Sequence, residues 1–220
     1  MNLANKLTIF RIILVPIMVI IPFLGIESEV YGIPLTYLLI DIIFIIASIT
    51  DKLDGYIARS RKQITTFGKF LDPLADKILV LAAMIMLVEF GKLPAWIPII
   101  VLAREFVVSG YRLIAVEKGG KVIAASKWGK LKTVTQMIAV ILAFVDMHPF
   151  GTCFLRVLQG AEFVLNLVVT IMMIIQTIAT IFSGIDYIKS GKKFFEEKTW
   201  QIKKCDLIYY EYFYILRKQV

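Results

Sequence analysis

Six long apolar segments dominate this 220-residue sequence and restrict the folds that it can adopt. The segments are residues 7–24, 34–57, 70–90, 95–116, 131–147 and 163–188. About 20 apolar helical residues cross a bilayer core, so each segment is long enough for one transmembrane helix. Apolar residues make up 59% of the chain, against about 45–50% in soluble domains. The sequence therefore predicts an all-α membrane protein, a bundle of six transmembrane helices.

Basic residues are distributed unevenly among the connections between these segments. Four lie in residues 59–69, seven in residues 104–132 and eight in the tail after the last segment. The turns near residues 25–33, 91–94 and 148–161 carry at most one each. By the positive-inside rule, both termini and the basic connections face the cytoplasm.

The formal net charge of +8 also bears on the partners of the chain. Because the basic residues lie beside apolar segments, the expected partners are the lipid bilayer and phosphorylated substrates, and no nucleic acid. Residues 1–190 are expected to form a membrane domain, followed by a basic, aromatic-rich cytoplasmic tail at residues 191–220. We expect this tail to be weakly ordered, with an interfacial amphipathic segment as the alternative.

Four carboxylates lie at the ends of two consecutive apolar segments. Asp51 and Asp54 are spaced i, i+3, and Asp72 and Asp76 are spaced i, i+4, so each pair shares one helix face. At one level of a helix hairpin these four charges would repel one another unless cations lay between them. Oxygen ligands favour magnesium, manganese or calcium, and four carboxylates suffice for two ions about 3.5–4 Å apart, an arrangement that grips phosphates.

The alternative is that these are ordinary interfacial aspartates paired with nearby lysines and arginines. Two neighbouring glycines, Gly55 and Gly68, favour a ligand site, since glycine lets backbone or ligand approach closely. Arg59 adds a planar donor fork that suits phosphate oxygens.

The whole stretch resembles the signature of the CDP-alcohol phosphatidyltransferase family. It reads Asp51-x2-Asp54-Gly55-x2-Ala58-Arg59-x8-Gly68-x3-Asp72-x3-Asp76. The resemblance covers about residues 2–190 and implies six transmembrane helices around a cytoplasm-facing polar active-site cavity. It further implies a multi-pass protein of the bacterial cytoplasmic (inner) membrane that forms a homodimer.

The resemblance also implies a reaction, the transfer of a phosphatidyl group from CDP-diacylglycerol to an alcohol with release of CMP. Asp51, Asp54 and Asp72 would be the principal ligands of a two-metal Mg²⁺ or Mn²⁺ site. Asp76 would be the general base and a further metal ligand. The implied residues for CDP-diacylglycerol are Asn5, Thr8, Gly55, Ala58, Arg59, Thr65 and Gly68. Capping of the first helix is the alternative for Asn5 and Thr8, and a loop or N-cap role is the alternative for Thr65.

Three further segments are similar to the bacterial branch of the family that uses glycerol-3-phosphate as acceptor. They begin at Asn5, at Arg104 and at Gly129. The residues implied for the acceptor are Arg104, Arg112, Lys130 and Lys132. Arg104 and Arg112 fall within about 80° of one helix face. The alternative is that the lysines only mark the cytoplasmic side, with Arg104 in a structural ion pair.

Arg104 lies inside an apolar run and requires a buried anion. Its neighbour Glu105 projects about 100° away around the helix and need not be that partner. His148 and Asp41 are expected to play no part in the chemistry, because both lie toward the other side of the membrane. Asn166, Gln176 and Ser183 are expected to join helices by hydrogen bonds.

Three other functions stay open at this stage. The acceptor could be phosphatidylglycerol, inositol phosphate or serine, since the acidic motif does not distinguish them. Intramembrane carboxylates also mark cation transporters, although repeated halves and broken helices are absent from this sequence. A structural membrane scaffold is the third alternative.

Overall fold

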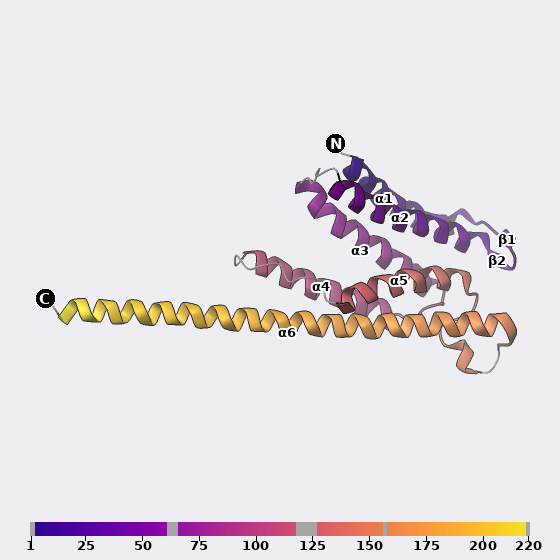
Figure 1. The fold of residues 1–220 in the computed structure, drawn as a ribbon. Coiled ribbons are helices and arrows are strands. Elements are labelled where there is room, and N and C mark those ends of the chain that lie inside the picture. The colour runs from indigo at the N-terminus through magenta and orange to yellow at the C-terminus, as the bar shows by residue number, and fades with distance from the viewer. Residues whose placement is uncertain (1–2, 61–65, 118–126, 156–157, 219–220) are drawn as a thin grey trace.

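Six α-helices, two short 3-10 helices and one short β-hairpin make up the regular structure of the described residues (Figure 1). This computed structural model describes residues 3–60, 66–117, 127–155 and 158–218, with side chains for residues 6–51, 74–111, 131–155 and 158–189. The elements are α1 (Leu3–Ile20), η1 (Ile21–Leu24), β1 (Glu29–Val30), β2 (Ile33–Pro34), α2 (Leu35–Ser60), α3 (Thr66–Glu89), α4 (Trp96–Glu117), α5 (Lys127–Val145), η2 (Thr152–Leu155) and α6 (Gly160–Lys218). The six expected helices are therefore confirmed as helices, with shifted boundaries.

Short turns rich in glycine connect the helices at one end of the bundle. Tyr31 and Gly32 join β1 to β2 with φ values of 55° and 78°, and Val30 pairs with Ile33 on either side of them. Two positive φ values at the centre of a two-residue loop match the twist of a hairpin. At the end of α3, Gly91 has φ 70° and donates its N–H to the Val88 carbonyl oxygen at 2.9 Å, so the chain reverses there.

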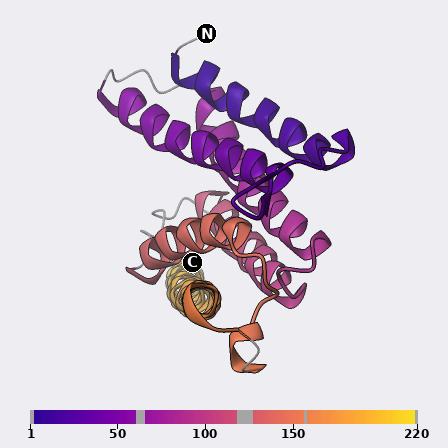
Figure 2. The same cartoon turned by 90° about the vertical axis from the view of Figure 1, so that its right-hand side faces the viewer.

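The helices pack as two groups that share a core. In one group α1 lies against α2 and α3, and in the other α6 lies against α4 and α5; contacts of α2 and α3 with α5 join the two groups (Figure 2). Phe44, Leu79, Phe144 and Met173 are fully buried and come from four different helices. The charged residues of α2, α3, α4 and α5 therefore lie on helices that pack into one bundle.

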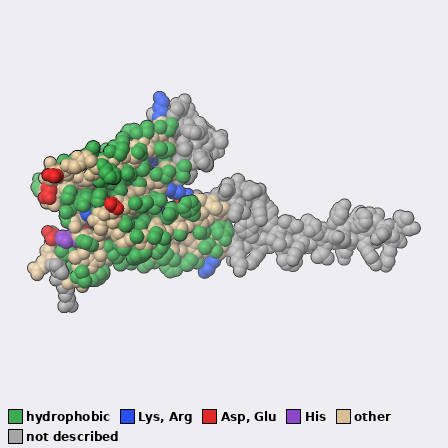
Figure 3. Space-filling view, turned by 180° about the vertical axis from the view of Figure 1, so that it is seen from behind, with side chains coloured by type: hydrophobic (Ala, Val, Ile, Leu, Met, Phe, Trp, Pro, Cys, Tyr) green, Lys and Arg blue, Asp and Glu red, His purple; other side chains and the backbone are tan. Residues whose placement is uncertain are grey.

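The outer surface of the bundle is apolar. Figure 3 shows hydrophobic side chains over most of the described surface on that face, with charged groups few and scattered. Phe23, Ile99 and Phe106 are each more than half exposed. A surface of this kind is unusual for a monomer in water, and it is the composition expected of helices that face lipid.

Two described segments, Lys6–Leu24 and Gly160–Lys189, combine the length and the apolar composition needed to cross a membrane. Among the remaining described helices, Leu131–Val145 is a shorter apolar stretch. The helices α2, α3 and α4 carry several of the charged residues predicted for the site. Six membrane crossings therefore stay a prediction, while six helices are observed.

Residues 191–218 are helical, and the weak order expected of this tail stays a prediction. The helix α6 continues without a break to Lys218 and projects far beyond the other helices (Figure 1). No proline interrupts this stretch, and the sequence spaces Lys192 and Glu196, and Lys193 and Glu197, at i, i+4. Both the lack of proline and these charge spacings favour helix.

Candidate active site

A cavity of about 560 Å³ opens between α3, α4, α5 and α6. Its apolar lining residues include Leu81, Leu102 and Met137. Its charged lining residues are Asp76, Lys77, Arg104, Glu105 and Lys132. Three of the predicted site residues, Asp76, Arg104 and Lys132, therefore line one cavity although they come from three helices.

The two predicted metal ligands whose side chains are described, Asp51 and Asp76, lie at the same end of the bundle. Asp51 Oδ1 is 2.9 Å from Nη1 of Arg11, a fully buried arginine of α1. The Nε of Arg11 donates to the Ala47 carbonyl oxygen at 3.3 Å. Asp76 lies within electrostatic reach of both Asp51 and Arg11. The two carboxylates therefore lie close enough to influence each other electrostatically, and their joint role as metal ligands stays a prediction.

Asp76 also offers an oxygen suited to a cation. Its Oδ1 is buried and has no hydrogen-bond partner among the described residues, a costly arrangement unless a ligand satisfies it. Within the described side chains no group of three or more His, Cys, Asp or Glu that could hold a metal ion occurs. The side chains of Asp54 and Asp72 lie outside the described residues. The described carboxylates fit a hard divalent cation by donor type and by the unsatisfied Oδ1 of Asp76.

Glu105 is the centre of the basic part of the cavity. Its Oε1 lies 2.5 Å from Lys132 Nζ and 2.9 Å from Arg104 Nη1. Its Oε2 lies 3.7 Å from Lys77 Nζ, and the same ammonium donates to Ser109 Oγ. One carboxylate of α4 thus contacts cations from α3, α4 and α5.

Residues of α6 hold the side chain of Arg104 in place. Its Nη2 donates to Ser183 Oγ at 2.6 Å, and its guanidinium carbon lies 5.7 Å from the ring centre of Tyr187. A Cβ at Gly184 would lie 3.4 Å from Arg104 Cγ, so the lack of a side chain there gives the arginine its room. The ion pair between Arg104 Nη1 and Glu105 Oε1 corrects the expectation that Glu105 need not be the partner of Arg104. Both side chains are long enough to fold toward each other.

The other predicted site residues are described only in part. Thr8 is buried on α1, three residues before Arg11. The backbones of Asn5, Gly55, Ala58, Arg59, Gly68, Asp72, Asp54, Arg112 and Lys130 lie in helices, but their side chains are outside the described residues. Thr65 lies outside the described residues altogether. The roles expected for these eleven residues, Thr8 included, stay predictions.

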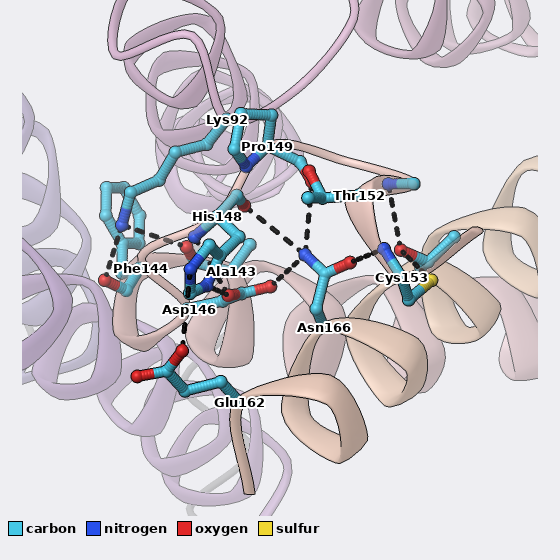
Figure 4. Close-up of polar contacts among 12 residues, drawn as sticks. Lys92, Ala143, Phe144, Asp146, His148, Pro149, Thr152, Cys153, Glu162 and Asn166 are labelled. Atoms are coloured by element: carbon cyan, nitrogen blue, oxygen red, sulfur yellow. Dashed lines mark hydrogen bonds and ion pairs between the residues drawn. The ribbon is translucent and has the colours of Figure 1, made fainter. Parts of the chain in front are cut away.

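A second polar cluster lies at the other end of α3 and α5, about 20 Å along α3 from Asp76 by helical rise. Figure 4 shows it: Asn166 of α6 donates to Asp146 Oδ2 at 2.8 Å and accepts from the Cys153 N–H at 2.8 Å. His148 lies between Asp146 and Glu162 at 3.6 and 3.7 Å. His148 thus takes part in a polar network that joins the turns, remote from the cavity.

The hydrogen bond expected between helices is confirmed at Ser183, which accepts from Arg104 of α4. The bonds of Asn166 join α6 to the turn that follows α5 and to η2. The prediction is wrong for Gln176, whose described hydrogen bond is to its neighbour Thr177 at 3.0 Å in the same helix.

Comparison with known proteins identifies the family of this chain. The model of the CDP-alcohol phosphatidyltransferase family matches residues 1–182. The chain belongs to this family. It is 50% identical over 154 residues to the CDP-diacylglycerol–glycerol-3-phosphate 3-phosphatidyltransferase of Bacillus subtilis strain 168, covering 68% of this chain and 79% of that protein. It is 40% identical over 195 residues to the protein of the same name from Haemophilus influenzae, covering 87% of this chain and 94% of that protein. A probable phosphatidylglycerophosphate synthase of Mycobacterium tuberculosis is 35% identical over 187 residues, covering 85% of this chain and 80% of that protein.

In this member of the CDP-alcohol phosphatidyltransferase family, several residues that line the cavity are not among those predicted from the sequence. Glu105, Lys77 and Ser109 were not among the predicted site residues, and Tyr187 gave no signal at all. Glu105 and Ser109 are four residues apart on α4, so they share a helix face, and Lys77 adjoins Asp76. These two spacings were the signals that could have located the residues. The family match does not cover Ser183 or Tyr187, which lie just beyond residue 182.

Proposed function

We propose that this chain transfers the phosphatidyl group of CDP-diacylglycerol to glycerol-3-phosphate, giving phosphatidylglycerophosphate and CMP. The observation that carries this proposal is that Asp76 and the Lys132–Glu105–Arg104 cluster line one cavity. A carboxylate that accepts a proton from a hydroxyl and a basic group that holds a phosphate are the two features that this acceptor needs. The names of the relatives support the same acceptor.

In this proposal Asp76 is the general base. It takes the proton of the acceptor hydroxyl, and Lys132 and Arg104 hold the acceptor phosphate nearby, together with Arg112 and Lys130. Asp51, Asp54, Asp72 and Asp76 would hold two Mg²⁺ or Mn²⁺ ions. The chemistry supplied by such bound ions is neutralisation of the pyrophosphate charge, which makes CMP a better leaving group.

The same proposal assigns the residues that bind the donor and the orientation of the protein in the membrane. Asn5, Thr8 and Arg59, with Gly55, Ala58, Thr65 and Gly68, would bind CDP-diacylglycerol. The six helices would cross the bacterial inner membrane with both termini in the cytoplasm, so that the cavity opens toward soluble glycerol-3-phosphate. The apolar outer surface and the distribution of basic residues support this placement. We include a homodimer in the proposal on the family resemblance.

The decisive experiment measures CMP release from CDP-diacylglycerol by the purified full-length protein. Glycerol-3-phosphate is compared with phosphatidylglycerol, inositol phosphate and serine, and Asp76→Asn serves as the inactive control. We expect release that depends on glycerol-3-phosphate and yields phosphatidylglycerophosphate. Faster release with another acceptor would assign a different alcohol, and cation flux through vesicles without any CMP release would point to a transporter.

A further inference from the structure

We propose that Glu105 is a positioning residue for the acceptor phosphate, fixing the ammonium groups of Lys132 and Lys77 on the cavity wall. This inference rests on the proposed function, because the acceptor phosphate is the anion that these ammonium groups would hold. It adds to that function a residue that contacts the cations of the site.

The first support is the geometry of the shared carboxylate. Glu105 Oε1 lies between Lys132 Nζ at 2.5 Å and Arg104 Nη1 at 2.9 Å, and Oε2 faces Lys77 Nζ at 3.7 Å. Three like charges at such short range repel one another. The Glu105 carboxylate is the group that holds these three cations together. Without it, the ammonium groups of Lys77 and Lys132 would no longer be held toward the same part of the cavity.

The second support is that Glu105 is itself held in place. Arg104 binds it through Nη1, while Nη2 is taken by Ser183 and the guanidinium rests near the Tyr187 ring. Each terminal nitrogen of Arg104 therefore makes one bond in the network, and a guanidinium has five N–H donors, so donors remain for an anion. The ammonium of Lys132 has three donors, and its described hydrogen bond is the one to Glu105. Lys132 and Arg104 can thus both bind a phosphate directly, and Arg104 also anchors Glu105.

The third support is the charge of the group. Lys77, Arg104 and Lys132 carry three positive charges and Glu105 one negative charge, which leaves a charge of +2 on this cluster, while Asp76 lines the same cavity with a further negative charge. A phosphate monoester carries a charge of about −1.5 to −2 near pH 7. The cluster therefore retains enough positive charge to bind such an anion with Glu105 in place.

The test is steady-state kinetics on the full-length protein with each substrate varied in turn. Glu105→Gln keeps the shape but removes the charge that orients the lysines. We expect its KM for glycerol-3-phosphate to rise about tenfold, the equivalent of one charged hydrogen bond, with KM for CDP-diacylglycerol unchanged. Glu105→Asp should recover part of the loss. Glu89→Gln, which removes an exposed carboxylate at the far end of α3, is the matched control and should behave as wild type.

Two kinetic results would overturn the inference. An equal rise of KM for both substrates would mean that Glu105 acts only on the fold. A fall of KM for glycerol-3-phosphate would mean that the carboxylate competes with the acceptor rather than preparing its site. If Glu105→Gln shows no cooperative thermal transition, Glu105→Asp decides: a selective rise of KM for glycerol-3-phosphate supports the inference, and wild-type KM overturns it.

A second measurement does not depend on turnover. Inorganic phosphate should raise the Tm of the wild-type protein, and should raise that of Glu105→Gln or Glu105→Asp by much less. Equal shifts in wild type and variant would reject the positioning role. If the wild type instead shows the phosphate shift but no turnover with glycerol-3-phosphate, the proposed function fails while the role of Glu105 in anion binding stands.

Discussion

Arg11 of α1 and Asp51 of α2 form an ion pair, with Arg11 Nη1 2.9 Å from Asp51 Oδ1. The side chain of Arg11 is completely buried, whereas that of Asp51 is 31% exposed. Arg11 therefore presents a fixed positive charge to a carboxylate at the edge of the candidate metal site. It also ties α1 to α2, because its Nε donates to the Ala47 carbonyl oxygen.

Replacing Arg11 should destabilise the protein and increase its dependence on metal. We expect Arg11→Met to lower the free energy of unfolding by up to about 3 kcal/mol, the lower end for loss of one partner of a buried pair, because Asp51 keeps some contact with solvent. Arg11→Lys should lose less, since the charge remains but the planar fork does not. Thermal unfolding in detergent measures both. Added Mg²⁺ should raise the Tm of Arg11→Met more than that of wild type, and equal shifts would argue against a cation site at Asp51.

Removal of divalent metal should abolish phosphatidyl transfer. A chelator in excess should stop CMP release, and Mg²⁺ or Mn²⁺ should restore it. Asp51→Asn should remove most of the activity at any metal concentration, because the amide loses both the charge and a metal-binding oxygen. Metal content and CMP release are measured on the same preparation. Full turnover with metal shown to be absent would contradict the two-metal proposal.

Asp76→Asn should remove turnover without removing donor binding. The amide keeps the size of the side chain but cannot accept the hydroxyl proton, and general-base catalysis contributes roughly 10²–10⁴-fold. We expect kcat to fall by at least about a hundredfold on that basis. Binding of CDP-diacylglycerol, measured separately by equilibrium titration, should stay close to wild type. A variant that keeps a tenth of the rate or more, roughly, would place the base elsewhere.

Lys92, in the turn between α3 and α4, should make stability depend on pH. Burial lowers the pKa of Lys92 from its ordinary 10.5 to about 8, opposed by the charges of Asp146 and Asp41. The unfolded chain therefore binds the proton more tightly than the folded protein. This contribution to stability is complete above about pH 10.5 and is lost as the pH falls toward 8.

Lys92→Met is the variant that tests this dependence, and its stability should not rise between pH 8 and 10 as that of wild type does. The variant also loses the bond from Lys92 Nζ to the Phe144 carbonyl oxygen at 3.0 Å, so the slope with pH is the informative quantity and not the absolute Tm. Parallel unfolding curves for wild type and variant across this range would show that Lys92 does not titrate there.

The sequence alone determined the elements of this protein and the chemical character of its site. Apolar segments of helical length predict each of the six helices, because helix formation follows the composition of neighbouring residues. The i, i+3 spacing of Asp51 and Asp54 and the i, i+4 spacing of Asp72 and Asp76 predict that each pair shares one helix face. These inferences depend on residues close together in the chain.

Only the tertiary structure decided which distant residues meet. Lys132 and Glu105 are 27 positions apart, and Arg104 and Ser183 are 79 apart, so their contacts depend on how α4, α5 and α6 pack. The same holds for Arg11 and Asp51 across α1 and α2. A helical pattern specifies the face on which a residue lies but not the helix that this face meets. Long side chains add to this uncertainty, and for that reason the central position of Glu105 emerged only from the packed bundle.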